Sequence, residues 1–163
     1  ILNADLALGL MDMGKYEEAL NTLNQIDKRY LSKWNGSLLI YYSNLMSLYT
    51  NIGEIEKAIE IYEDKIKNYP IRILTESMTM DIVLANKSFY GKEYNTSKEF
   101  FHKVLNNNKS RRLKVQIYYI LANIAEQDGN LEEAIIKYKI VGDKGNKLYA
   151  SYLAKEKLKV LQH

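Results

Sequence analysis

The chain has 163 residues with a formal net charge of +3; 47% are hydrophobic and 26% charged, and there is one proline and no cysteine. Such a chain can bury a core, and the lack of cysteine excludes disulfides, thiolate nucleophiles and zinc–thiolate sites. One proline and 8 glycines supply too few turns for a sandwich of many short strands, so we expect an all-α fold.

No apolar run approaches the roughly 18 residues that a membrane-spanning helix needs, and no secretory signal is visible, so we expect a cytoplasmic protein. The chain opens without methionine and inside a helical pattern, which suggests a segment of a longer protein. The 19 lysines against 4 arginines point to an AT-rich, bacterial genome.

Four similar segments follow one another along the chain. A small residue recurs at spacings of 39, 39 and 37, as Ala19, Ala58, Ser97 and Ala134. A leucine column keeps the same spacings as Leu6, Leu45, Leu84 and Leu121. A fixed period of this length is typical of repeat proteins, so we expect four repeats at about residues 1–34, 35–71, 72–109 and 110–145.

Each repeat is expected to contain two helices. In the second repeat, residues 37–50 carry apolar side chains at the three-and-four spacing of a helix with one buried face. Gly53 ends that helix, and a second helix with acids in its first turn runs towards Pro70, which stops it. The fourth repeat has the same pattern, with Gly129 at the turn and a second helix through about Val141. The third departs furthest, because Gly91 lies one place early.

A further helix is expected over residues 146–161, after Gly142 and Gly145 interrupt the pattern. It carries four lysines beside its apolar residues. Repeat arrays need a terminal element with one polar face, so this helix is either a cap or the first helix of another repeat.

The repeated pattern resembles tetratricopeptide repeats. The features in common are the leucine-small pair in the first helix, the glycine at the turn, Glu-Glu-Ala in the second helix and an aromatic residue four positions later, and they cover essentially the whole chain. Sel1-like repeats are the rival family. The resemblance implies a right-handed α-solenoid of four helix-turn-helix repeats plus a C-terminal capping helix, forming a single domain over residues 1–163.

The resemblance also implies a concave groove lined by the first helix of each pair. The positions that line the groove in that family imply a peptide-binding surface in this chain. Its residues are Leu8, Met11, Ser43, Ser47, Asn51, Ile82, Asn86, Phe89, Tyr90, Tyr119, Asn123 and Gln127. Amide side chains can bond both N–H and C=O of a peptide, and aromatic side chains offer anchors. The alternative is an ordinary solvated groove. Its polar columns include Asp12 and Glu126 but no basic residue, which disfavours a clamp for a C-terminal carboxylate.

Other features of the sequence carry weaker signals. The basic residues Lys109, Arg111, Arg112 and Lys114 could contact an anion, nucleic acid or membrane surface, but without interleaved aromatics a solvated loop is the better interpretation. Trp34 either packs under its loop or is an exposed contact residue. His102 and His163 are interpreted as surface histidines.

The sequence has no phosphate loop, nucleophile elbow or metal-binding helix motif, so we expect no enzymatic activity, no cofactor and no metal. The leading hypothesis is a protein–protein interaction module that binds a neutral or mildly basic peptide segment. One alternative is the peptide-sensing part of a larger transcriptional regulator whose DNA-binding domain precedes Ile1. Another is a self-associating scaffold, which would form homo-oligomers.

Overall fold

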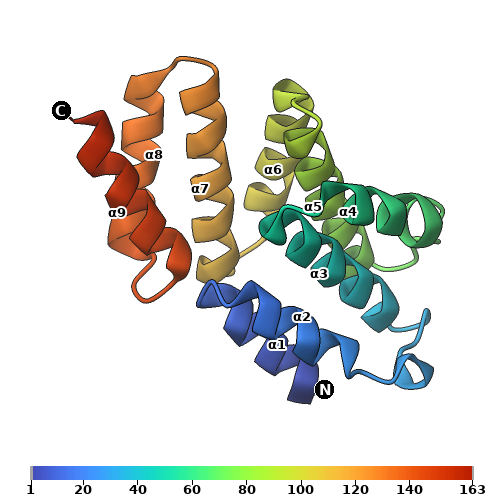
Figure 1. Cartoon of the computed structure of the whole chain (residues 1–163). Coiled ribbons are helices and arrows are strands. Elements are labelled where there is room, and N and C mark those ends of the chain that lie inside the picture. The colour runs from blue at the N-terminus through green and yellow to red at the C-terminus, as the bar shows by residue number, and fades with distance from the viewer. Residues whose placement is uncertain (1, 163) are drawn as a thin grey trace. The chain divides into compact units, whose positions relative to one another are not determined.

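The computed structural model describes residues 2–162, with only the backbone at Leu2. Every regular element in this range is helical, which confirms the all-α prediction (Figure 1). The chain divides into two compact units, residues 1–91 and 92–163, which are described in turn.

The first unit contains five α-helices, α1 (Leu2–Asp12), α2 (Tyr16–Asn24), α3 (Ser37–Ile52), α4 (Ile55–Ile61) and α5 (Leu74–Tyr90). A short 3-10 helix, η1 (Lys28–Tyr30), lies between α2 and α3, and the π-helical turn η2 (Tyr62–Ile66) extends α4. Helix α1 pairs with α2 and α3 pairs with α4, as the repeats predict. Helix α3 also packs against α1, α2 and α5.

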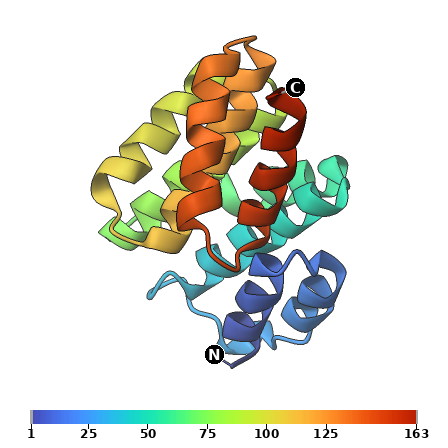
Figure 2. The ribbon, with the colours of Figure 1, turned by 90° about the vertical axis from the view of Figure 1, so that its left-hand side faces the viewer.

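The second unit contains α6 (Tyr94–Asn107), α7 (Arg111–Gln127), α8 (Leu131–Lys144) and α9 (Tyr149–Leu161). Helices α7, α8 and α9 lie side by side (Figures 1 and 2). Helix α9 packs against both members of the preceding pair, as α3 does in the first unit. The expected terminal helix is therefore present, three residues shorter at its start than the sequence predicts.

The repeated small residue is fully buried in every repeat. Its four occurrences are all at most 1% exposed: Ala19, Ala58, Ser97 and Ala134. The column just after the repeated leucine is buried as well, as Ala7, Met46, Ala85 and Ala122. Small side chains at a crossing let two helix backbones approach closely, so the period found in the sequence marks the packing seam.

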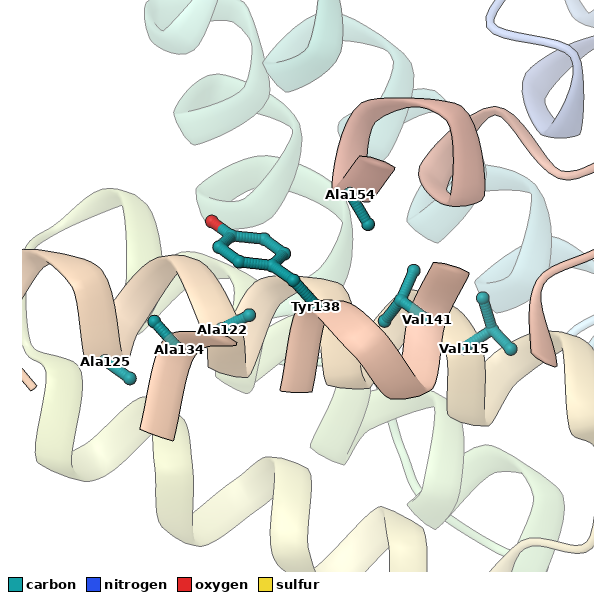
Figure 3. Close-up of a cluster of buried hydrophobic side chains, with 7 residues drawn as sticks. All are labelled: Val115, Ala122, Ala125, Ala134, Tyr138, Val141 and Ala154. Atoms are coloured by element: carbon teal, nitrogen blue, oxygen red, sulfur yellow. The ribbon is translucent and has the colours of Figure 1, made fainter. Parts of the chain in front are cut away.

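Each unit has its own apolar core. In the first unit one cluster joins Leu23 of α2 with Leu45 and Leu48 of α3. A second joins α3, η2 and α5 through Leu39, Ile66 and Val83. In the second unit the Tyr138 ring is fully buried among alanines of α7, α8 and α9 (Figure 3). The small neighbours leave the space that this large ring fills.

The turns inside the repeats use a left-handed residue. Gly53 has φ +93°, and Gly14 and Gly129 take the same conformation. In the third repeat Gly91 has φ −75°, and Lys92 is the left-handed residue, with φ 61°. Lys92 lies 39 residues after Gly53, in the column where the other repeats have glycine. The third repeat therefore keeps the turn but builds it from a residue that disfavours it.

Replacing this lysine should stabilise the protein. We expect Lys92→Gly to raise the free energy of unfolding by about 0.5–1 kcal/mol, because glycine adopts φ > 0 without steric cost. The matched control is Gly53→Ala, whose new Cβ would meet open space. It should lower stability by about 1 kcal/mol through backbone strain alone. Urea denaturation followed by circular dichroism measures both, and a destabilised Lys92→Gly protein would contradict the assignment.

One local prediction is wrong. Gly142 does not interrupt the helix: α8 continues through it to Lys144, and Gly142 is buried against α9, where its carbonyl accepts a 3.0 Å hydrogen bond from Ser151. Of the two alternatives for Trp34, the structure supports the exposed one, since 80% of its surface is exposed. No helix within residues 2–162 combines the length and apolarity that crossing a bilayer requires.

Candidate functional site

Four of the predicted groove residues share one face of α5. Ile82, Asn86, Phe89 and Tyr90 follow the helical spacing of positions i, i+4, i+7 and i+8. The first three are half-buried and Tyr90 is more exposed. The Phe89 and Tyr90 rings meet edge to face, with their centroids 5.2 Å apart. This face therefore presents one amide between apolar and aromatic side chains.

The amide of Asn86 is available for a ligand. Its side chain makes no hydrogen bond with any other residue in the described part of the chain. A half-buried amide without a partner can still form its full set of donor and acceptor bonds. On this face, Asn86 is the polar group best able to recognise a peptide backbone.

Tyr90 connects this face with α3. Its hydroxyl hydrogen-bonds with the Thr50 side chain at the end of α3. Burial raises the pKa of Tyr90, while the hydrogen bond with Thr50 opposes that rise. Tyr90 is therefore neutral at physiological pH and is held by a neighbouring helix, which fixes the direction of its ring.

The predicted residues of α3 differ in exposure. Ser43 is buried, Ser47 is half-buried and Asn51 is exposed. The Asn51 amide donates a 2.7 Å hydrogen bond to the Ser47 carbonyl of its own helix. Asn51 also lines an open cleft with Ile52 and the first turn of α2. Of these three, Asn51 is the most accessible to a ligand.

In α1, the predicted Leu8 and Met11 are both half-buried. Met11 packs against the core cluster that joins α1, α2 and α3. The structure thus gives Met11 a packing role in addition to the predicted place on the ligand surface.

In the second unit, the predicted Tyr119 and Asn123 belong to a hydrogen-bonded network. The Tyr138 hydroxyl lies 2.5 Å from Asn123 Oδ1 and donates a 2.8 Å hydrogen bond to Glu126 Oε2. The Asn123 amide also hydrogen-bonds with Tyr119, whose ring centroid is 5.8 Å from that of Tyr138. Lys157 of α9 completes the network with a 2.8 Å ion pair to Glu126 Oε1.

The network fixes the protonation of its members. Burial and the Glu126 carboxylate raise the pKa of Tyr138 far above its usual range, so its hydroxyl stays a donor. Partial burial alone would raise the pKa of Glu126, but the hydrogen bonds from Lys157 and Tyr138 outweigh it and lower that pKa. Burial also raises the pKa of Tyr119. Asn123 is consequently held in one orientation, unlike Asn86, and Gln127 beyond it is exposed with an uncommitted amide.

The basic run lies at the start of α7 in the second unit. Lys109 and Arg111 are exposed, whereas Arg112 and Lys114 are half-buried. Arg111 Nε donates a 3.0 Å hydrogen bond to the Lys144 carbonyl at the end of α8. At least one member of the run therefore caps a helix C-terminus, where a cation is favourable.

The remaining candidates are the histidines and possible metal ligands. His102 is exposed, and His163 lies outside the described residues. Among residues 2–162, no group of three or more histidine, aspartate or glutamate side chains is placed to hold a metal ion.

Sequence reasoning did not find several residues that shape these surfaces. Tyr138 carries no sequence signal beyond the aromatic position of the second helix, and Lys157 none beyond its place in the lysine-bearing terminal helix. Thr50 is not among the predicted groove residues, and only the fold shows its contact with Tyr90. The hydroxyl of a buried tyrosine needs a partner, but neither the burial of Tyr138 nor the identity of its partners can be read from its column, which it shares with Tyr62.

Successive paired helices, with a buried small residue at the same position of each repeat and a left-handed residue in each turn, define a tetratricopeptide-type repeat protein. The comparison with protein families agrees: residues 2–140 match the family described as SusR N-terminal TPR domain, and the chain belongs to this family. No curated protein and no solved structure matches the chain. Tetratricopeptide domains bind proteins or peptides, so the chain is a domain of the protein-interaction class.

Proposed function

We propose that this domain binds a peptide segment of a partner protein on the concave side of its repeats, with the α5 face as the principal contact. The observation that carries the proposal is the uncommitted, half-buried amide of Asn86, which lies between Ile82 and the Phe89–Tyr90 ring pair. An amide in this setting can hold the backbone of an extended or helical peptide, while the apolar neighbours hold its side chains.

The two asparagines expected to hold the ligand contribute differently. Asn86 would bind the ligand directly. The amide of Asn123 is already shared between Tyr119 and Tyr138, so a ligand would have to displace internal bonds to use it. We therefore assign Asn123 a positioning role and place Gln127 as the available amide of the second unit.

The charge of the surface supports a neutral or mildly basic ligand. None of the twelve residues proposed for the groove is basic, and Asp12 and Glu126 lie in the same columns. Lys157 compensates Glu126, which leaves a weakly acidic surface. A strongly acidic peptide would find no cation to pair with among these residues.

The proposal is tested by separating binding from stability. Short peptides are selected from a displayed random library against the full chain, and their affinities are measured by isothermal titration calorimetry. Asn86→Ala should weaken binding about tenfold or more, because the backbone of the ligand loses a donor and an acceptor. Its thermal midpoint should stay unchanged, since the amide makes no internal bond.

Asn123→Ala is the matched comparison. It should lower the thermal midpoint, because Tyr138 loses one acceptor, and it should weaken binding less than Asn86→Ala does. The double variant should bind more weakly than either single variant. Unchanged affinity in both Asn86→Ala and the double variant would sink the assignment of this surface.

A second candidate function is the sensory part of a larger regulator, in which a small signalling peptide occupies the same surface. The family description, an N-terminal domain, favours a longer protein in which further domains follow this one rather than precede it. The coding sequence on either side of the segment tests this candidate. A DNA-binding motif after the domain would support it, and a coding sequence with no further domain on either side would refute it.

A further inference from the structure

The first unit exposes large apolar side chains at the end opposite to Tyr90. They belong to the connection between α2 and α3, which projects from the helices in Figure 2, and to the segment that leads into α5. We call residues 28–34 and 71–74 the loop-end surface. Its exposed apolar members are Tyr30, Trp34, Ile71, Ile73 and Leu74, of which Tyr30, Trp34 and Leu74 are 85%, 80% and 74% exposed.

Specific contacts join the two segments of this surface. The Arg72 guanidinium lies over the Trp34 ring, 4.6 Å from its centroid. The same side chain donates a 3.0 Å hydrogen bond to the Lys33 carbonyl, which also accepts a 3.2 Å bond from the Tyr69 hydroxyl. Trp34 is therefore exposed but held in place, and an exposed side chain that is already ordered loses less entropy on binding.

The loop-end surface carries uncompensated positive charge. Residues 28–35 and 67–75 contain no acid, although residues 1–81 as a whole carry 12 acidic and 8 basic side chains. Lys28, Lys33 and Arg72 form no ion pair with any other described residue, whereas Arg29 is paired with Asp27. The acid that follows, Glu76, is buried, and its Oε2 accepts from the backbone nitrogens of Arg72 and Ile73.

We propose that the loop-end surface is a second docking site, separate from the α5 face, for an acidic protein segment that also carries apolar side chains. The fork of the Arg72 guanidinium can grip a carboxylate through the N–H groups that Lys33 leaves free. Trp34, Tyr30 and Leu74 cover the apolar part of the segment, and tryptophan, tyrosine and arginine are the residues that dominate interface energetics. The two docking sites have opposite charge preferences and so select different partners.

An anionic membrane surface is the competing occupant. Sequence elements that bind anionic lipid carry about four to eight clustered lysines or arginines. The loop-end surface has three unpaired cations, one of them fixed against an indole ring. That arrangement suits discrete carboxylates on a peptide better than a diffuse layer of headgroups.

Trp34 is the only tryptophan in the chain, which makes it a reporter of this site. Two libraries of short displayed peptides are selected against the full chain, one combining acidic with apolar residues and the other combining basic with the same apolar residues. We expect the acidic library to yield peptides that bind at the loop-end surface, whereas peptides from the basic library should bind at the α5 face and leave Trp34 emission unchanged. The acidic peptides, synthesised without tryptophan, should shift Trp34 emission to the blue and bind more weakly as salt rises.

Variants locate the binding. Arg72→Ala and Leu74→Ser should each weaken the acidic peptides about tenfold, and Arg72→Lys should restore only part of the affinity because it keeps the charge but not the fork. Asn86→Ala, on the α5 face, and Lys139→Ala, an exposed lysine of α8, are controls that should leave the affinity unchanged. Thermal melting confirms that each variant is folded.

Three outcomes would overturn the proposal. Basic peptides that shift Trp34 emission as much as the acidic ones would remove the charge preference. Acidic peptides that bind Arg72→Ala, Arg72→Lys and Leu74→Ser as tightly as the unsubstituted protein would place them elsewhere. An emission shift that appears only with phosphatidylserine vesicles would assign the surface to a membrane.

Discussion

Tyr138→Ala is expected to lower the free energy of unfolding by about 4 kcal/mol, the loss typical of removing a large buried aromatic ring. The ring is fully buried, and the other buried residues of its cluster are four alanines and two valines, whose short side chains cannot reach into the space it would leave. Denaturation by urea, followed by circular dichroism, measures the change. Tyr152→Ala, at an exposed tyrosine of α9, is the control and should alter stability little.

Tyr138→Phe separates the ring from its hydroxyl. It keeps the packing but removes the hydroxyl that donates to Glu126 Oε2 and lies beside Asn123 Oδ1, so a loss of about 1–2 kcal/mol is expected. The alanine variant must therefore be clearly worse than the phenylalanine variant. Equal losses in the two would mean that the hydroxyl, and not the ring, carries the contribution of Tyr138.

The second large effect is expected at Gly145→Ala, with a loss of about 1–3 kcal/mol through overpacking. A Cβ at Gly145 would lie 2.6 Å from the Cβ of Ser151 and 2.6 Å from the Val141 carbonyl oxygen. Neither group can move away easily, because Ser151 is buried and hydrogen-bonded to Gly142. Thermal and urea denaturation would report the loss.

Gly142→Ala is the matched control for this prediction. Its Cβ would meet only the Lys155 side chain, at 3.5 Å, which is ordinary contact. Because Gly142 lies inside α8, alanine should also improve helix propensity, and the variant should be as stable as the natural protein or more so. A Gly145→Ala protein as stable as Gly142→Ala would show that the turn between α8 and α9 adapts to a side chain.

The repeat positions could be predicted because the periodic constraint acts on the backbone. Ala19, Ala58, Ser97 and Ala134 are all fully buried, and within each compact unit the alanines lie on helices that pair closely with their neighbours, so the same constraint recurs along the chain. The turn column was equally readable at Gly14, Gly53 and Gly129, whereas the left-handed conformation of Lys92 in the third repeat emerged only from the structure. A pattern that recurs at a fixed period can be checked against its other copies in the same sequence.

Positions that depend on one particular neighbour could not be read in this way. Gly142 looks like an interruption until its contact with Ser151 of the next helix is known. Trp34 lies in a connection with no period, and its ring is held by Arg72, which is 38 positions further along the chain. Pairs of this kind are set by tertiary packing alone.

The ligand surface is an intermediate case. The helical face of Ile82, Asn86, Phe89 and Tyr90 follows from spacing, but spacing treats Asn86 and Asn123 alike. Only the three-dimensional partners of Asn123 distinguish them, because they include a tyrosine from the following helix. The assignment of these residues to a ligand remains a prediction for the binding experiments.

The network at Tyr138 also bears on where the domain ends. The family match stops at residue 140, inside α8, yet Ala154 belongs to the same core as Tyr138, and Lys157 neutralises Glu126. A protein cut at the edge of the match would lose the last turn of α8 and the whole of α9, leaving an apolar seam open and a carboxylate without its counter-ion. We infer that a stably folded domain must extend at its C-terminal end through Leu161.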